Sequence, residues 1–434
     1  MLINEESGMD RVSTTNTINS VVIVGLGYVG LPLALKLSAH FSVIGFDVSD
    51  SKISHLKQGV DVTKQHSSEE ITKSGILFTS STSDILKKTV YILCVPTPID
   101  QYHQPDLSFI RSAGETVGKC IGHESVVVLE STVYPGVTEE ILAPILEKNS
   151  GLKLGEFGVA YSPERVNPGD ANHTIDKIIK IVSASDQKSL EKIQQMYSQI
   201  TQVYVSPSIK VAESAKVIEN IQRDLNIALV NELTCLFDRL DVNVHEVLKA
   251  AGTKWNFHNY KPGLVGGHCI GVDPYYLTHK AKEVGFHSEI ILAGRRVNDN
   301  MHVYCAQRIL KKLYSMKRNN NIGNNGNNNQ TNNHSILIMG LTFKKNVADY
   351  RNSRVKELIS ELKKYNVTIY GYDPYISEDV IQSHFGIKCA TLEEVGTTVD
   401  LVIPAVEHRE ISSSLSTFLA ASNFRFAEKI FHLF

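Results

Sequence analysis

Short runs of aliphatic and β-branched residues alternate with amphipathic stretches through the first half of the chain. Apolar positions at helical spacing fill several of the intervals, as at 31–39 and 107–120. Such alternation predicts a doubly wound sheet of parallel strands with helices on both faces. The predicted strands are Val21–Val24, Ser42–Asp47, Val90–Val95, Ser125–Glu130 and Phe157–Tyr161.

The pattern changes beyond Pro207, where apolar residues recur every three or four positions. This spacing predicts one helix of about 30 residues, about 45 Å long. A helix of that length usually spans between domains or packs against a partner chain, which can cover an exposed apolar face. We therefore expect a homodimer. The apolar positions are Val211, Ala215, Ile218, Ile221, Leu225, Leu229, Leu233, Leu236 and Leu240.

The opening pattern recurs more loosely near the end of the chain. The segments 335–345, 370–374 and 401–408 are similar to 21–30, 44–48 and 91–98. We expect an α/β protein with two Rossmann-like, doubly wound parallel-sheet domains joined by a long central helix. The expected divisions are a flexible tail (1–20), a first domain (21–206), a central helical domain (207–305) and a second domain (306–434). Residues 319–333 are largely Asn and Gly and are expected to form a disordered loop.

The composition narrows the class of protein. With 42% hydrophobic and 21% charged residues, the 434-residue chain is typical of a soluble globular protein. Its 44 Lys and Arg against 46 Asp and Glu give a net charge of -2, which argues against nucleic-acid and membrane-surface partners. Six cysteines without CxxC spacing argue against a disulfide framework and fit a reducing cytoplasm.

One stretch, 21–37, is apolar enough to suggest a signal peptide or a membrane span. The segment before it is acidic, and three glycines and Pro32 interrupt it, so a buried strand, turn and helix is the better interpretation. We expect a cytoplasmic protein without membrane association.

GLGYVG (25–30) follows a predicted strand and opens a predicted helix. Gly25 allows the tight turn, Gly27 lets the backbone approach a pyrophosphate, and Gly30 permits close packing of helix and strand. Asp47 lies 22 positions after Gly25, where its carboxylate can accept hydrogen bonds from a ribose and repel a 2′-phosphate. The pattern predicts a dinucleotide site with NAD favoured over NADP, although Lys52 weakens this preference slightly.

GLVGGHCIGVDPYY (263–276) is a second unusual stretch, in which four glycines surround Cys269. A loop so rich in glycine permits sharp curvature and a close approach to ligand phosphates, and a cysteine there can serve as a nucleophile. A neighbouring Lys can lower the pKa of such a thiol. The alternatives are a small buried hydrophobe or a zinc ligand with His258, His268 and His279, but these spacings match no zinc pattern. We expect no metal.

On the long helix, Glu213, Lys216, Asn220 and Arg223 form a polar stripe at spacings of three and four. The simplest interpretation is a solvated face. A helix rich in Asn and Gln at this point is nevertheless unusual, which leaves a functional role equally open.

Seven motifs together resemble those of the UDP-glucose/GDP-mannose dehydrogenase family of nucleotide-sugar 6-dehydrogenases. The resemblance runs from about residue 20 to about 410. The Cys269 motif looks like that of the branch acting on UDP-N-acetylhexosamines, in particular the UDP-N-acetylglucosamine and UDP-N-acetylgalactosamine enzymes of capsule and O-antigen synthesis. The motifs are GLGYVGLPLA, VPTP (95–98), ESTVYPG (130–136), YSPERVNPG (161–169), AESAKVIENIQRDLNIALVNE (212–232), KPGLVGGHCIGVDPYYL (261–277) and FKKNVADYRNS (343–353).

The resemblance implies an NAD-binding domain over 21–206, a dimer-forming central domain with the catalytic loop over 207–305, and a UDP-binding domain over 306–434. The implied reaction oxidises the sugar C6 alcohol to a carboxylate in two steps, with two NAD⁺ and one water. Cys269 would carry a thiohemiacetal and then a thioester. Lys216 and Asn220 would stabilise the oxyanions, and Asp273 and Glu164 would orient the hydrolytic water, with Thr132 nearby.

The resemblance also implies two sets of binding residues. NAD contacts would come from Gly25, Gly27, Tyr28, Val29, Gly30, Asp47, Lys52, Thr97, Thr132 and Arg354. Contacts with the UDP-sugar would come from Arg165, Val166, Lys216, Asn220, Arg223, Gly263, Phe343, Lys344 and Arg351.

Three features depart from the family pattern. Pro168 stands where some members carry a second carboxylate, so water activation would rest on Glu164 and Asp273. The Asn-rich insertion is foreign to the pattern. The chain ends with AEKIFHLF (427–434), where such enzymes usually continue, which suggests an altered C-terminal domain.

Other functions remain open at this level. A two-electron hydroxyacid dehydrogenase shares the first domain but needs neither a nucleophilic Cys269 nor a second nucleotide domain. A catalytically silent UDP-sugar or NAD-binding protein would fit the unusual C-terminal end. Within the family, UDP-N-acetylmannosamine or UDP-glucose is the alternative substrate, because epimers differ by one hydroxyl position.

Overall fold

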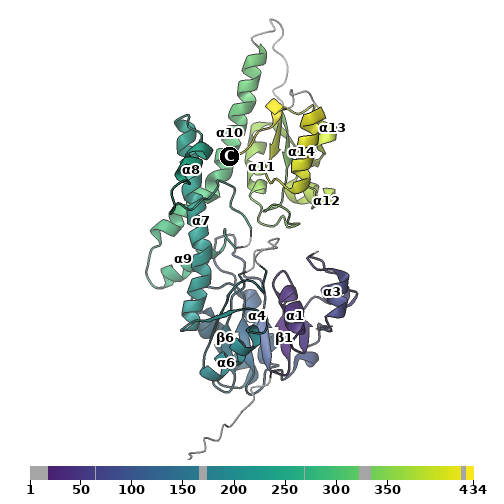
Figure 1. Ribbon diagram of the computed structural model, residues 1–434, viewed down its shortest axis with the longest axis vertical. Coiled ribbons are helices and arrows are strands. Elements are labelled where there is room, and N and C mark those ends of the chain that lie inside the picture. Colours follow the sequence, from purple (N-terminus) through teal and green to yellow (C-terminus); the bar gives the residue numbers. More distant parts are fainter. Residues whose placement is uncertain (1–17, 64, 166–173, 268, 322–333, 422–426) are drawn as a thin grey trace, which may run out of the picture.

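The computed structural model describes residues 18–63, 65–165, 174–267, 269–321, 334–421 and 427–434. Two units built on sheets lie at either end of a pair of long helices (Figure 1). This arrangement confirms the expected α/β class with two Rossmann-like domains and a central helix.

The N-terminal sheet has eight strands among the described residues, in the order β3-β2-β1-β4-β5-β6-β7-β8. Neighbouring strands run parallel except β6 and β7, which pair in antiparallel fashion. All five predicted strands are present, and the sequence pattern missed β3, β7 and β8. The strands are β1 Val21–Val24, β2 Val43–Phe46, β3 Leu77–Thr79, β4 Val90–Leu93, β5 Val126–Leu129, β6 Gly158–Tyr161, β7 Lys180–Ala184 and β8 Val203–Val205.

Helices cover both faces of this sheet, because side chains alternate along each strand. Val22 and Val24 of β1 pack into one core with α4 and α5, whereas Val21 and Ile23 pack into the other core with α1 and α6. The helices of this unit are α1 Gly30–Ser38, α2 Asp50–Lys57, α3 Ser68–Lys73, α4 Ser108–Gly118, α5 Ala143–Ser150 and α6 Gln187–Tyr197, with short turns at Thr82–Ile85 and Val137–Leu142.

The centre of the molecule consists of α7 Ile209–Arg239, α8 Val244–Ala251, α9 Asp273–Glu283 and α10 Glu289–Asn321. α7 is 31 residues long, as the apolar spacing predicts, and it packs along α10. α10 continues into the C-terminal unit and packs on α11, so the division expected between residues 305 and 306 falls inside one helix.

The C-terminal sheet has four parallel strands in the described residues, in the order β11-β10-β9-β12. Its strands are β9 His334–Met339, β10 Val367–Tyr372, β11 Lys388–Cys389 and β12 Leu401–Pro404. Its helices are α11 Val355–Leu362, α12 Glu378–Val380, α13 Leu392–Val395 and α14 Arg409–Ala421, with short turns at Lys363–Tyr365, Ile381–Phe385 and Ala427–Lys429.

The last residues of the chain pack on this sheet. Ile430 forms a bridge beside Val402 of β12, and the Phe431 amide donates to the Val402 carbonyl at 2.9 Å. Leu433 is 3% exposed, and its carbonyl accepts a hydrogen bond from Arg308 of α10. The unusual C-terminal segment is therefore an ordered part of the second domain.

The tail (1–20), expected to be flexible, and the Asn-rich loop (319–333), expected to be disordered, differ from these expectations in part. Residues 1–17 and 322–333 lie outside the described residues. Ser20 is bound, since its hydroxyl and carbonyl accept hydrogen bonds from the amides of Thr89 and Val90. Residues 319–321 belong to the backbone of α10.

The two domains share one device at the start of their sheets. The Leu26 amide donates to Asp47 at 2.9 Å, and the Leu341 amide donates to Asp373 at 2.6 Å. In each domain a carboxylate at the end of the second strand therefore holds the turn after the first strand. In the second domain fully buried His408 also contacts Asp373, at 3.1 Å, on the same oxygen that accepts the Leu341 amide.

The apolar stripe of α7 is only partly covered. Five of its residues are 47–59% exposed, and they lie whole turns apart on one face: Val211, Ile218, Leu229, Leu236 and Leu240. We refer to these five as the apolar face of α7. The buried side of the helix instead carries Glu213, Lys216, Asp224 and Asn231.

No helix within the described part of the chain is long and apolar enough to cross a lipid bilayer.

Candidate active site

The turn after β1 has the geometry that the three glycines require. Gly25 has φ +93, and a Cβ there would lie 2.7 Å from the Cys94 carbonyl oxygen. A Cβ on Gly30 would overlap the Gly25 carbonyl, whereas a Cβ on Gly27 would meet no atom within 4 Å. Gly27 therefore faces open space beside the start of α1, which has no side-chain cap at Val29. Free amides at a helix N-terminus suit a pyrophosphate.

Asp47 is buried and has three partners. It accepts hydrogen bonds from the amides of Leu26 and Ser49 at 2.9 and 3.0 Å, and Lys52 Nζ lies 2.6 Å from its Oδ2. The carboxylate thus holds the turn, and it is also the group expected to accept hydrogen bonds from a ribose. Lys52, expected to touch NAD, neutralises this carboxylate in the structure.

Two further residues expected to touch NAD lie along the same edge. Thr97 follows β4 and is half-buried beside α9, where the Tyr276 hydroxyl donates to the Pro98 carbonyl at 3.2 Å. The Tyr28 ring lies 5.8 Å from the Arg351 guanidinium carbon. Burial and nearby Asp349 raise the pKa of Tyr28.

Two arginines of the C-terminal domain have protein partners that the sequence did not indicate. Arg351, expected to touch the UDP-sugar, lies over Tyr28 of the cofactor turn and binds Asp349 through two hydrogen bonds. Arg354, expected to touch NAD, donates a hydrogen bond to Asp299 of α10.

The loop that carries Cys269 is held from both sides. Asn231 of α7 makes a pair of hydrogen bonds with the backbone of Gly263, at 2.9 and 3.0 Å. The Gly267 amide donates to the Asn352 carbonyl of the C-terminal domain at 3.0 Å. Gly267 has φ +88, and a Cβ there would lie 2.7 Å from the Phe343 ring, so only glycine fits this position.

Cys269 lies in the turn just before α9, where its carbonyl accepts hydrogen bonds from the amides of Val272 and Asp273. The residue as a whole is exposed, whereas its thiol lies in desolvated surroundings. Desolvation by the surrounding protein and the charge of Asp273 raise the pKa of its thiol to about 11, although Lys216 and Lys344 act in the opposite direction. The expectation that a neighbouring Lys lowers the thiol pKa below its usual range is wrong, because desolvation outweighs both cations.

Asp273 is 3% exposed and accepts a hydrogen bond from the Asn220 side-chain amide. Burial raises its pKa to about 6, against the influence of Lys216 and Asn220. Lys216 is also buried, and its charge acts on both Cys269 and Asp273. The structure thus brings together Cys269, Lys216, Asn220 and Asp273, and the polar stripe of α7 is covered by protein rather than solvated at Lys216 and Asn220.

Thr132 and Glu164 follow the neighbouring strands β5 and β6 and so lie at the same edge of the sheet. Beneath them is a cluster that the sequence did not reveal: Lys180 binds Glu130 at 2.7 Å and the Pro163 carbonyl at 3.1 Å, and Tyr197 donates to Glu130. Burial raises the pKa of Glu130 to about 7. The cluster anchors the backbone just before Thr132 and Glu164.

The remaining residues expected to bind the sugar nucleotide are arranged around this edge. Arg165 is paired with Glu219 of α7, at 2.8 Å, and donates to the Ile179 carbonyl. Arg223 is exposed on α7. Phe343 contacts the Cys269 loop, and Lys344 is close enough to influence the thiol. Val166 lies outside the described residues.

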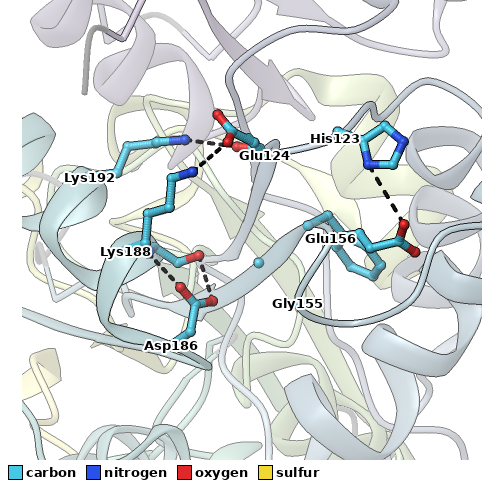
Figure 2. Close-up of a pocket in the computed structure, with 10 residues that line it drawn as sticks. His123, Glu124, Gly155, Glu156, Asp186, Lys188 and Lys192 are labelled. Carbon is cyan, nitrogen blue, oxygen red and sulfur yellow. Dashed lines mark hydrogen bonds and ion pairs between the residues drawn. The ribbon is translucent and has the colours of Figure 1, made fainter. Parts of the chain in front are cut away.

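Two pockets lie away from this group. One, of about 260 Å³, lies at the amino ends of β5 and β6, the opposite edge from Thr132 and Glu164 (Figure 2). Its charged groups pair with one another, as in Lys188 with Glu124 at 2.5 Å. The other, of about 350 Å³, lies between α7, α8 and α10. Neither pocket is lined by a cysteine. Within the described residues, no group of three or more His, Cys, Asp or Glu side chains could hold a metal ion.

Comparison with known protein families gives matches along most of the chain. Three domains of the UDP-glucose/GDP-mannose dehydrogenase family match this chain: the NAD binding domain over residues 19–201, the central domain over 210–300 and the UDP binding domain over 337–426.

Individual relatives match over nearly the full chain. Protein CapL of Staphylococcus aureus is 48% identical over 90% of both chains. UDP-N-acetyl-D-glucosamine 6-dehydrogenase of Pseudomonas aeruginosa is 45% identical over 95% of both chains. The structure of a UDP-D-ManNAc dehydrogenase from Pyrococcus horikoshii aligns with a TM-score of 0.82 at 28% identity, over 95% of this chain and 93% of the other.

A dinucleotide turn, a glycine-rich cysteine loop and a second nucleotide-binding domain define an NAD-dependent dehydrogenase with two Rossmann-like domains. The chain belongs to the UDP-glucose/GDP-mannose dehydrogenase family. NAD is its cofactor, and Gly25, Gly27, Gly30 and Asp47 have the geometry to hold it.

The different surroundings of the glycines predict separable effects. Gly27→Ala adds a methyl group to open space, so the melting temperature should stay within about 2 °C of wild type, while NAD⁺ affinity falls about tenfold or more. Gly30→Ala forces its methyl group into the turn, so it should cost about 1–3 kcal/mol of stability. Thermal unfolding and calorimetric titration with NAD⁺ measure the two effects. Equal NAD⁺ affinity in Gly27→Ala and wild type would contradict the placement of the pyrophosphate.

The electrostatics of the thiol predict its reactivity. Because its pKa is about 11, alkylation of Cys269 by iodoacetamide should accelerate about tenfold per pH unit from about pH 7 to 9.5. Asp273→Asn removes a nearby anion and should speed alkylation, and Lys216→Met removes a cation and should slow it. Mass spectrometry of the Cys269 peptide measures the rate, with Cys269→Ser as the blank. A rate independent of pH would show that the thiolate is already formed.

Proposed function

We propose that the protein oxidises the C6 hydroxyl of a UDP-N-acetylhexosamine to the corresponding uronic acid, for surface-polysaccharide synthesis. The proposed substrate is UDP-N-acetylglucosamine or UDP-N-acetylgalactosamine. Two kinds of observation support this substrate class. The relative named for UDP-N-acetylglucosamine is 45% identical, whereas the solved structure named for the mannosamine epimer is 28% identical. The gathering of Cys269, Lys216 and Asp273 supports an active enzyme rather than a silent binding protein.

The chemistry requires two oxidations at one carbon. Bound NAD⁺ supplies a hydride acceptor for each. The first oxidation removes a hydride from C6 and a proton from its hydroxyl, leaving an aldehyde. An aldehyde yields no second hydride in this way until a nucleophile adds to its carbon. The Cys269 sulfur adds to form a thiohemiacetal, and loss of the second hydride leaves a thioester.

Water then cleaves the thioester, which releases the carboxylate and restores the thiol. The net reaction consumes one alcohol, two NAD⁺ and one water and yields one carboxylate, two NADH and three protons. The residues of this chain bind, orient and move protons at each stage.

The thiol needs a proton acceptor when it adds to the aldehyde, because at a pKa of about 11 only about one thiol in ten thousand is ionised at neutral pH. Asp273 is suited to that role. With a pKa of about 6 it is largely ionised at neutral pH, and it is close enough to influence the thiol. The same carboxylate, with Glu164, can later accept a proton from the hydrolytic water.

Lys216 and Asn220 are suited to the negative oxygen that develops at C6. Lys216 is buried beside the thiol, and Asn220 is oriented by its hydrogen bond to Asp273. Donors held in place in a desolvated site stabilise an oxyanion more than water does. Thr132 follows β5 as Glu164 follows the neighbouring β6, and we assign it to the same catalytic group.

A substrate panel tests the proposal. UDP-N-acetylglucosamine, UDP-N-acetylgalactosamine, UDP-N-acetylmannosamine and UDP-glucose are each incubated with NAD⁺, and NADH absorbance and the sugar product are followed. Preference for UDP-N-acetylmannosamine or UDP-glucose would establish the alternative substrate. Binding of a UDP-sugar without NADH formation would establish a silent binding protein.

Replacement of the nucleophile predicts where the reaction stops. Wild-type protein should form two NADH per sugar acid without releasing aldehyde. Cys269→Ser should bind NAD⁺ and UDP-sugar within a few-fold but make no acid, because a serine hydroxyl barely ionises at neutral pH. Cys389→Ser, distant from the site in the C-terminal sheet, is the matched control. Acid formation by Cys269→Ser at the wild-type rate would remove the thioester pathway.

The functional unit that we propose is a homodimer formed through α7. The apolar face of α7 is uncovered in a single chain, and exposed apolar stripes of this length on helices are usually covered by a partner. The free cysteines agree with a cytoplasmic location.

The dimer is tested at the centre of this face. Leu229→Glu, at a position 57% exposed, should leave the fold intact and shift the protein toward monomer or aggregate in light scattering. Ser108→Glu, an exposed position on α4, is the control and should not change the mass. Wild-type protein that is already monomeric at micromolar concentration would contradict the proposal.

A further inference from the structure

Asp299 of α10 connects three elements that the proposed reaction requires. Its Oδ1 accepts hydrogen bonds from Arg295 of α10 and from Arg354 of the C-terminal domain. Its Oδ2 accepts from the Tyr275 hydroxyl at 2.6 Å. Tyr275 lies two residues after Asp273 on α9, so one carboxylate joins α9, α10 and the UDP-binding domain.

The contacts continue from Asp299 into the core of the central domain. Arg295 is 1% exposed and donates to Asp224 of α7 at 2.6 Å. Asn298 donates to the same carboxylate at 2.8 Å and accepts from Asn231, also at 2.8 Å. Asn231 is the residue that holds Gly263, so this buried chain ends on the Cys269 loop.

Arg354 makes the same connection from the other domain. Its Nε donates to the Val265 carbonyl of the Cys269 loop at 3.4 Å, and its Nη2 donates to Asp299. The backbone beside it is packed tightly against the loop, since a Cβ on Gly266 would lie 2.5 Å from the Asn352 carbonyl oxygen and 3.3 Å from the Arg354 amide.

The charges stabilise this contact, and we refer to the ion pair of Asp299 with Arg354 as the latch. Arg354 has two acidic neighbours, Asp299 and Glu357. Arg295 likewise lies between Asp224 and Asp299. Each guanidinium group is therefore paired with two carboxylates.

We propose that Asp299 is a positioning residue that couples the UDP-binding domain to the Cys269 loop, through Arg354 on one side and Tyr275 on the other. The latch holds the thiol and Asp273 in register with a sugar nucleotide bound by the C-terminal domain. This inference rests on the proposed function for its catalytic consequence, but the coupling itself can be measured without turnover.

The kinetic test uses Asp299→Asn and Arg354→Met, with Glu357→Gln as the matched control. Glu357 also contacts Arg354 but lies on α11 of the same domain, so its loss leaves the latch to α10 in place. Asp299→Asn and Arg354→Met should each lower kcat about tenfold or more and leave the KM for UDP-sugar within about threefold, because the thiol is misplaced while the substrate still binds. Glu357→Gln should retain wild-type kcat.

The combination of the two variants measures the coupling. If Asp299 and Arg354 act through each other, the double variant should be no slower than the slower single variant. Independent, multiplicative losses would overturn the latch, as would a kcat within twofold of wild type in both single variants.

A second readout needs no reaction. UDP should change the rate at which iodoacetamide alkylates Cys269 in wild type and in Glu357→Gln, because the nucleotide and the loop are connected through the latch. In Arg354→Met, which removes the contacts with Asp299 and Val265, UDP should still bind by calorimetry but leave the alkylation rate unchanged. If UDP changed the alkylation rate in Arg354→Met as much as in wild type, the proposal would be overturned.

The kinetic readout and the alkylation readout together distinguish failure of the proposed function from failure of the coupling. A wild-type protein that makes no sugar acid, yet shows the UDP response that Arg354→Met abolishes, would refute the proposed function and retain the coupling. A wild-type protein that makes sugar acid while both latch variants match it would retain the proposed function and refute the coupling.

Discussion

Buried polar groups must find partners, and α7 presents them along one side of 31 residues. Near its start, buried Glu213 accepts hydrogen bonds from the Gly136 and Thr138 amides of the N-terminal domain. Farther along, Asp224 and Asn231 bind α10 and the Cys269 loop. Each buried polar group left without a hydrogen-bond partner would cost about 1–3 kcal/mol of folding stability. These bonds therefore fix the position of α7 against each neighbouring element. The site lies between these two anchors, which is why its geometry depends on them.

The two similar domains differ in the group that lies beside a corresponding carboxylate. In each sheet the turn after the first strand is held by an aspartate, Asp47 or Asp373, whose carboxylate accepts the amide of the turn. The oxygen that accepts this amide also contacts Lys52 in the first domain and fully buried His408 in the second. A shared folding device is thus completed by a lysine in one domain and by a buried imidazole in the other.

The proposed catalytic group is suited to stepwise proton movement. Desolvation raises the pKa of the Cys269 thiol to about 11 and that of Asp273 to about 6, so the two groups differ widely in acidity while lying close together. The thiol therefore stays largely protonated at neutral pH, and its proposed addition to an aldehyde requires a proton acceptor such as Asp273. Lys216, which acts on both groups, offsets part of the cost of bringing negative charge to this position.

The sequence by itself determined the strands of the first sheet, the long helix, the dinucleotide turn and the residue types of the site, because these depend on local periodicity and on spacing within single segments. It could not show which side of α7 is buried. Apolar residues lie on both sides, and the polar side is covered only because Gly136, Arg295 and the Cys269 loop arrive from distant parts of the chain. Nor could it predict the thiol pKa or the protein groups that Arg351 and Arg354 contact. Charge balance and desolvation are sums over neighbours in space, and only the tertiary structure decides which neighbours those are.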